Sequence, residues 1–412
     1  MKNNHDEKEF NYSEFSHIEP TPETTVIHTD KEYVKENLDL SLNENLFKFV
    51  ELERSSGMSS LSGKQKRIGV DIAGRFFKNY FALISLIVFA SIFLISIIAP
   101  AISQFGSNTA ILPIDYQFIS NLPPSYAPIV TEVLTTTQLE HVEKVLGALA
   151  DKKELTPNGD WLVTYNKYDL INATLQITDP NAGGFGTIVG TTQEGIDIWT
   201  RTWTATRDSL MLSILVAFVE TVIGIVIGAY LGFHAGTWID TVLTRVIDII
   251  KNVPSIIWFL LLVSLFKDVN FGTLFLSLVI IGWTAPVYQT RLWMITVKDQ
   301  EYILASKSIG ASTNRQIFFH ALPAIIGKLA TSLVQRIVIV IFFISSLSFL
   351  GFIPHGGEPN LGTILNEARS QVENNIWILL LPSLILLLIS LSTQFIANGL
   401  HDALDPKLAG GK

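Results

Sequence analysis

The sequence contains six apolar runs that are each long enough to cross a lipid bilayer. They occupy residues 81–102, 210–232, 246–266, 271–291, 329–352 and 376–398. The hydrocarbon core of a bilayer is roughly 30 Å thick, and a helix needs about 20 apolar residues to cross it. Hydrophobic residues make up 48% of the chain and charged residues only 16%. The runs therefore predict an all-α polytopic protein of the cell membrane with six transmembrane helices embedded in the lipid bilayer.

Six spans place both termini on the same side of the membrane, and the basic residues indicate which side this is. Those on the terminal side are Lys64, Lys66, Arg67, Arg75, Lys78, Arg245, Lys298, Lys307, Arg315 and Lys328. The short loops of the other side offer mainly Lys267 and Arg369. Because lysine and arginine are enriched in cytoplasmic loops, we expect both termini to be cytoplasmic.

The spans divide the chain into five predicted parts. These are an acidic cytoplasmic tail at 1–79, the first transmembrane helix at 80–102, an extracytoplasmic insert at 103–208, a five-helix core at 209–400 and a cytoplasmic tail at 401–412. Because the first apolar run follows a long polar tail, it is interpreted as a permanent anchor and not as a cleavable signal peptide.

The N-terminal tail carries most of the negative charge of the chain. Residues 1–60 hold 13 acidic and 6 basic residues, a local balance of −7 against −8 for the whole sequence. Such a polar segment is predicted to be mostly disordered. Residues 41–53 have near-helical apolar spacing after a capping-box pattern, which indicates either a short interfacial or partner-binding helix or a transient helix in solvent.

The insert at 103–208 is too long and too patterned to be a simple loop, and we expect a small α+β domain. The pattern predicts a helix at 130–149, strands at 161–165 and 174–178, and a glycine-rich turn at 183–186. Two interpretations stay open for this domain. It could contact a protein that delivers the solute, or it could be a structural addition that never meets the substrate.

Several kinds of chemistry are excluded by the residues present. The chain has no cysteine, so disulfides, thiol nucleophiles and cysteine-ligated metals are ruled out, and its 8 histidines lack ligand-like spacing. Residues 57–65 faintly resemble a phosphate-binding loop, but the glycines are one residue too far apart and Gln65 stands where Ser or Thr should be. We therefore predict no catalytic residues, no metal, no cofactor bound by this chain and no nucleic-acid partner.

Charged residues inside the apolar runs are the most informative ones there, because a charge near the bilayer centre costs at least about 2.5 kcal/mol. The candidates are Glu220, Asp248, Lys251 and Arg336. Asp248 lies three residues from both Arg245 and Lys251 and could pair with either along its own helix. Glu220 lies in the middle of its run, and we hypothesise that it pairs with Arg336.

Small and helix-breaking residues in the runs suggest where helices approach or bend. Gly224, Gly228 and Gly232 recur every fourth residue, which clears one helix face for close packing. Pro254 and Pro286 predict kinks, which can line a transport path but are also common in membrane bundles.

A polar segment at 301–323, within the loop 293–328, separates two of the apolar runs. Its sequence predicts two short helices that meet at Gly310, an arrangement that suits docking of a soluble partner. The segment resembles the "EAA" loop of ABC importer permeases, in which Glu-Ala-Ala precedes a glycine and then Leu-Pro. The residues that carry this candidate coupling site are Glu301, Leu304, Ala305, Ser306, Gly310, Ala311, Leu322 and Pro323.

The resemblance continues from about 190 to 408 and is close to the oligopeptide, dipeptide and nickel permeases, specifically to the second (OppC/DppC-like) of their two membrane subunits. Seven signatures occur in the family's order: the segments 190–197, 282–283, 301–302, 310–312, 320–323, 347–351 and 402–406. Four positions depart from the family pattern. Leu304 replaces the first Glu of the triad and Ser306 replaces its second Ala, while Ile196 replaces an Arg and Ile344 replaces a Glu.

The resemblance implies a type I ABC importer (MetI-like) core and a set of partners. These would be a sister permease, two ATP-binding subunits that use ATP and Mg, and an extracytoplasmic substrate-binding protein. We favour peptides as the solute, with nickel or another small solute as the alternative. Two rival classes are a secondary transporter driven by an ion gradient through Glu220 and a membrane scaffold whose outer domain is the working part. The ordered signatures and the lack of evident inverted repeats argue against the former.

Overall fold

The computed structural model describes residues 68–112, 116–147, 151–178, 184–266, 269–353 and 359–404. The chain divides into two compact units, Met1–Lys66 and Arg67–Lys412, and every described residue belongs to the second. The acidic tail up to residue 67, the predicted helix at 41–53, Lys267 and the end of the 402–406 signature lie outside the described residues.

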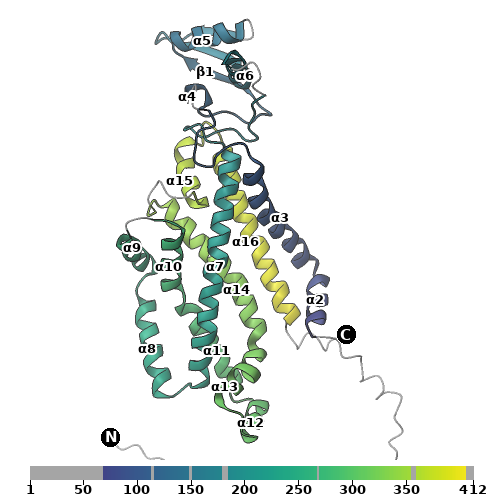
Figure 1. Ribbon diagram of the computed structural model, residues 1–412. Helices are drawn as coiled ribbons and strands as arrows, with labels where there is room; N and C mark the ends of the chain where they lie inside the picture. The colour runs from purple at the N-terminus through teal and green to yellow at the C-terminus, as the bar shows by residue number, and fades with distance from the viewer. Residues whose placement is uncertain are drawn as a thin grey trace, which may run out of the picture. The chain divides into compact units, whose positions relative to one another are not determined.

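Long apolar helices form a bundle in which α3, α7, α14 and α16 run side by side (Figure 1). Their bounds are Tyr80–Ile102 for α3, Ile198–Phe233 for α7, Leu322–Phe349 for α14 and Trp377–Leu404 for α16. A short amphipathic helix, α2 (Ile68–Lys78), precedes α3. Asn79 lies between the two helices and caps the N-terminus of α3. Two further helices, α10 (Phe271–Gly282) and α11 (Thr284–Val297), together form one more candidate span.

The remaining predicted span, at 246–266, is not a single helix. The chain forms α8 (Trp238–Asn252) and α9 (Ser255–Leu265), which are bent by 83° at the break between them. Val253 is extended, with φ −82° and ψ 129°, a conformation that proline favours in the residue before it. The described part of the chain thus has five helices long enough to span a bilayer, and six spans if the bent pair counts as one.

The second span also begins earlier than predicted. Helix α7 starts at Ile198, ten residues inside the expected insert, because the side chain of Asp197 accepts a hydrogen bond of 2.8 Å from the backbone of Thr200. The first three turns of α7 are buried, but their sequence is rich in threonine and tryptophan. They therefore do not appear as part of a long apolar run.

The outer insert contains a three-stranded antiparallel sheet in the order β1-β3-β2. The strands are β1 (Ile129–Leu134), β2 (Asp151–Leu155) and β3 (Trp161–Asn166), and the helices are α4 (Tyr116–Ile119), α5 (Thr136–Leu146) and α6 (Lys167–Thr178). Its core contains Phe118, Leu139, Val142, Val163, Tyr165 and Leu170. The α+β prediction and the strand at 161–165 are confirmed.

Two elements predicted for the insert are wrong. The segment 130–134 is a strand and not the start of a helix, because it pairs with β3 along its whole length. A capping box formed by Thr135 and Gln138 starts α5 only after that strand. The segment 174–178 is the end of α6 and not a strand. Its alternation of apolar and polar residues fits a strand equally well, which is a common ambiguity for short segments.

The insert is attached to the bundle by side chains at and just after the end of helix α15 (Leu361–Gln371), an element that the sequence analysis did not predict. Asn375 donates hydrogen bonds to the carbonyl oxygens of Leu122 and Val189, at 3.2 and 2.9 Å. Gln371 accepts a bond of 2.9 Å from the backbone of Gln193. The base of the insert is therefore fixed to the loop between α15 and α16.

The three glycines of α7 let this helix approach α11 closely. A Cβ atom added to Gly224, Gly228 or Gly232 would overlap with atoms of α11, including the Pro286 side chain and the carbonyl oxygens of Val287 and Arg291. The packing interpretation of the repeat is confirmed. A larger residue would force apart two helices whose backbones are nearly in contact.

We expect Gly228→Ala to destabilise the bundle by about 1 to 3 kcal/mol, as overpacking does in closely packed cores. The thermal unfolding of the purified protein in detergent measures this effect. Gly74→Ala is a matched control in α2, because an added Cβ there has no atom within 4 Å. Equal unfolding temperatures for the two variants would contradict the packing role.

Candidate functional site

The predicted coupling segment consists of two short helical stretches on either side of a glycine. Helix α12 (Glu301–Ser308) is followed by Gly310, whose φ of +87° lies in the left-handed region. The backbone amides of Gly310 and Ala311 donate to the carbonyls of Lys307 and Ser306, both at 3.0 Å, which closes the helix end. Helix α13 (Thr313–Arg315) and the π-helical stretch η4 (Gln316–Ala321) then lead into α14. The hinge prediction is confirmed.

One face of α12 is held firmly against the bundle. Ile303 is 1% exposed and belongs to a cluster with Ala229 of α7, Met294 of α11, and Ile317 and Ile325. The hydroxyl of Ser306 donates to the carbonyl of Ile303, and the side chain of Gln316 donates to the carbonyl of Ala311 at 2.6 Å. Ile303 thus joins α12 to a single cluster with residues of α7, α11 and α14.

The opposite face of the coupling segment is exposed and partly apolar. Tyr302, Leu304, Ile309 and Phe319 are 46%, 49%, 87% and 75% exposed. Glu301, Ala305, Gly310 and Pro323 are exposed as well, whereas Ala311 and Leu322 are half-buried. The predicted residues thus lie together in one segment, and only Ser306 points inward. Partial burial raises the pKa of the Tyr302 phenol above its ordinary value.

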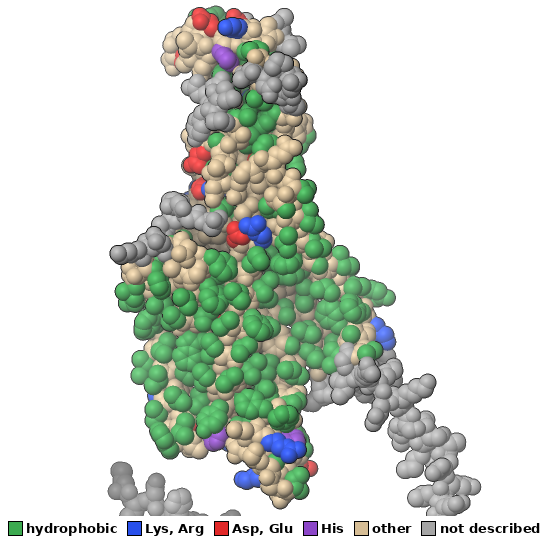
Figure 2. All heavy atoms as spheres, in the orientation of Figure 1, with side chains coloured by type: hydrophobic (Ala, Val, Ile, Leu, Met, Phe, Trp, Pro, Cys, Tyr) green, Lys and Arg blue, Asp and Glu red, His purple; other side chains and the backbone are tan. Residues whose placement is uncertain are grey.

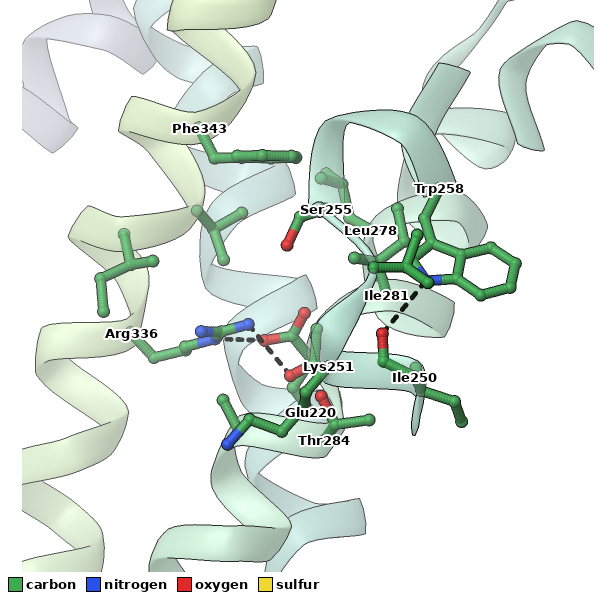
Figure 3. A pocket seen from close by; sticks show the side chains of 15 residues that line it. Glu220, Ile250, Lys251, Ser255, Trp258, Leu278, Ile281, Thr284, Arg336 and Phe343 are labelled. Carbon is green, nitrogen blue, oxygen red and sulfur yellow. Dashed lines mark hydrogen bonds and ion pairs between the residues drawn. The ribbon is translucent and has the colours of Figure 1, made fainter. Parts of the chain in front are cut away.

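A second site lies inside the bundle, where Glu220 of α7 meets Arg336 of α14. The Nε of Arg336 donates to Oε2 of Glu220, and its Nη2 donates to the carbonyl oxygen of Gly282 at 3.0 Å (Figure 3). The Glu220 side chain is 1% exposed and that of Arg336 is 16% exposed. The hypothesised pair is present, and it joins α7, α10 and α14.

Gly282 makes room for this pair. A Cβ atom at that position would overlap with the Glu220 carboxylate and the Arg336 guanidinium. Glycine also leaves its own carbonyl open to the guanidinium. The site thus depends on Glu220, Gly282 and Arg336, which are far apart in the sequence.

Asp248 was expected to pair with Arg245 or Lys251, and this prediction is wrong. Among the described residues, Asp248 forms no ion pair with either. The carboxylate that pairs in this region is Asp240 of α8, which accepts hydrogen bonds of 2.6 and 2.7 Å from the guanidinium of Arg291. Lys251 instead lies over the ring of Tyr288, with its Nζ 4.2 Å from the ring centroid. Both partners belong to α11, so interhelical contacts replace the expected pairing along α8.

The sequence analysis also missed an ion pair at the end of the bundle that carries the insert. Nη2 of Arg201, in the first turns of α7, lies 2.7 Å from Oε1 of Glu367 in α15. Arg201 was not considered because it fell in the predicted insert. The only available signal was a charged residue just before an apolar run, which is common at membrane surfaces.

Known families match two parts of the chain. Residues 224–410 match the family described as the binding-protein-dependent transport system inner membrane component, and residues 69–124 match the N-terminal transmembrane domain of oligopeptide transport permease C. The oligopeptide transport system permease protein OppC of Mycoplasma genitalium is 33% identical over 379 residues, which cover 89% of this chain and 98% of that protein. The chain belongs to this permease family.

Other relatives show how the similarity is distributed along the permease. OppC of Mycoplasma pneumoniae is 34% identical over 378 residues, which cover 89% of this chain and 97% of that protein. The dipeptide permease DppC of Haemophilus influenzae is 31% identical over 170 residues, which cover only 41% of this chain and 57% of that protein. Because the two mycoplasma matches cover nearly the whole permease, they run through at least part of the outer insert.

We expect removal of Glu220 alone to damage the permease more than removal of both charges. Glu220→Gln leaves the Arg336 guanidinium inside the bundle without its carboxylate, and loss of one partner of a buried pair costs about 3 to 5 kcal/mol. The double variant Glu220→Gln with Arg336→Met removes this unpaired charge. Expression level and thermal unfolding in detergent measure both effects. Equal damage in the single and double variants would contradict a mutual role.

Proposed function

We propose that the permease is the transmembrane subunit of an ATP-driven importer of oligopeptides. Relatives that match almost its full length are named oligopeptide transport system permease proteins. The importer would contain a sister permease, two ATP-binding subunits and an extracytoplasmic substrate-binding protein. ATP and Mg would be used by the ATP-binding subunits, and this chain would supply part of the transport path.

One observation carries the coupling role of the segment 301–323. It is anchored through Ile303 to α7 and α14, and it presents Tyr302, Leu304 and Ile309 on its free face. An ATPase that holds this face and changes shape would move α7 and α14 as packed bodies. Coupling over tens of ångströms needs such rigid elements, because a flexible loop would absorb the displacement.

The exposed Leu304 suggests how the ATPase contact differs from the family pattern. A glutamate at this position would present a carboxylate to the partner, whereas this permease presents an apolar side chain beside the exposed Glu301. We infer that the ATPase groove is more apolar at the point that receives Leu304. A matching change on the ATPase would preserve the contact.

Charge distribution supports a cytoplasmic location for the coupling segment and for both termini. Lys298, Lys307, Arg315 and Lys328 lie in or beside this segment, and Figure 2 shows basic side chains at the end of the bundle where α12 lies. By the positive-inside rule this end faces the cytoplasm. With α8 and α9 counted as one span, the number of spans is even and the termini share that side.

The ion pair of Glu220 weighs against the rival proposal of an ion-driven carrier. A carboxylate that carries protons must be released and bound during transport, whereas Glu220 is held by Arg336 in the bundle interior. Co-purification tests the two proposals. An ATPase pair and a sister permease retained by the tagged chain support the importer, and transport by this chain alone would overturn it.

The solute class has its own test. Mass spectrometry of what the cognate binding protein retains after purification would show peptides under this proposal. Retained nickel, with no peptide, would replace it with the alternative of a metal permease.

A charge introduced on the free face of α12 should weaken ATPase docking. We expect Ala305→Glu to lower the amount of ATPase that co-purifies by at least about tenfold, because it places a carboxylate in an apolar contact. Ala305 is exposed, so the permease itself should still fold and insert. Ser370→Glu is the matched control on the exposed surface of α15 at the other end of the bundle.

The glycine hinge gives an independent test of the same role. Gly310→Val should also reduce docking, because a β-branched residue at a φ of +87° costs on the order of 1 to 3 kcal/mol and displaces α12. Membrane insertion, followed by fractionation, should persist. Unchanged transport in both coupling-segment variants would contradict the coupling assignment.

A further inference from the structure

A cavity of about 210 Å³ opens beside the Glu220–Arg336 pair. Helices α8 and α9, the junction of α10 and α11, and α14 form its walls (Figure 3). Its volume is many times the roughly 15 Å³ that one water molecule needs, so it can hold several waters or the end group of a solute. Its polar lining consists of Glu220, Lys251, Ser255, Thr284 and Arg336, and its apolar lining includes Trp258, Leu278 and Phe343.

The break between α8 and α9 lies at the wall of this cavity. The chain is extended at Val253 and Pro254, and α9 begins with Ser255, so the first amides of an 11-residue helix lie at the cavity wall. A helix N-terminus favours negative charge. Figure 3 shows the Ser255 hydroxyl directed into the space between Arg336 and Phe343. Ser255 is exposed, so the cavity is accessible from outside the bundle.

The charges that line the cavity do not cancel. Glu220 is already paired with Arg336, and Lys251 adds a second cation. Lys251 is exposed and is held over the ring of Tyr288 rather than by a carboxylate. Asp248, on the same helix, is not among the residues that line the cavity. The lining thus carries one net positive charge within an apolar wall, where electrostatic attraction is stronger than in water.

We propose that this cavity is a binding site for an anionic end group of the transported solute, namely a carboxylate. The guanidinium of Arg336, the ammonium of Lys251, the Ser255 hydroxyl and the start of α9 are donors suited to carboxylate oxygens. Trp258, Leu278 and Phe343 would contact the adjoining apolar part. The proposal rests on the proposed function and adds a place where the transported solute would contact this chain.

A carboxylate group and a lipid phosphate share this chemistry, and an accessibility experiment separates them. The native chain has no cysteine, so a Ser255→Cys variant carries a single thiol in the cavity. Membrane vesicles that contain this full-length variant are labelled with an anionic sulfonatoethyl and a cationic trimethylammonioethyl methanethiosulfonate. The ratio of the two labelling rates reports the local potential, because any change in thiol pKa affects both reagents alike.

We expect Ser255→Cys to favour the anionic reagent, relative to Ser264→Cys on the same helix, which does not line the cavity. Adding Lys251→Gln should lower the ratio by at least about twofold, because it removes one cation from the lining. Lys328→Gln, which removes an exposed lysine outside the cavity, should leave the ratio unchanged. If Ser255→Cys does not fold, Ala285→Cys places the thiol in the same lining.

Ligand protection completes the test. A tripeptide with a free C-terminal carboxylate should slow labelling of Ser255→Cys, and the same peptide with an amidated C-terminus should not. An unchanged ratio in Lys251→Gln, or equal protection by both peptides, would overturn the proposal. Protection by anionic phospholipid alone would assign the site to a headgroup and would also overturn it. No ATPase takes part in the assay, so its failure is distinct from failure of the importer assignment.

Discussion

The close backbone contact between α7 and α11 is the constraint on which the rest of the bundle depends. It exists because three glycines, one turn apart, remove side chains from one face of α7. In lipid, helices gain little from burying apolar side chains, so close van der Waals contact has to hold them together. With α7 fixed in this way, its remaining faces receive α3, α10, α14 and α16. The position of Glu220 relative to Gly282 and Arg336 follows from this arrangement.

Much of the fold could be predicted from composition, because a bilayer allows few alternatives to helices. The positions of most spans, the α+β nature of the insert and the glycine hinge at 310 all follow from local patterns. The break in the third span lies at Pro254, where a kink was predicted, but its size could not be predicted, since Val253 and Pro254 are apolar and give no sign that the span divides into two helices. A proline indicates a possible kink, but whether the helix bends by 83° or continues depends on what packs around it.

The residues of the coupling segment could be predicted because they lie next to one another in the sequence. The intramembrane charges were harder, because each partner is on a different helix. Glu220 and Arg336 could be paired by elimination, since an isolated charge at that depth is too costly. The ion pair of Asp240 and Arg291 was not predicted, since both residues lie near the ends of apolar runs, where charges are common. The local spacing of Asp248 and Lys251 favoured a pair that tertiary packing replaced with the stacking of Lys251 on Tyr288.

Helix α14 connects all the sites of the permease. Its first turn follows η4, which packs against α12, so it begins at the coupling segment. Arg336, midway along it, holds Glu220 and lines the cavity at the α8–α9 break. Near its far end, Ser345 meets Gly362 of α15 so closely that a Cβ on that glycine would overlap with the Ser345 backbone. Since α15 leads to the side chains that hold the insert, packed contacts run without a break from α12 through η4, α14 and α15 to the base of the insert.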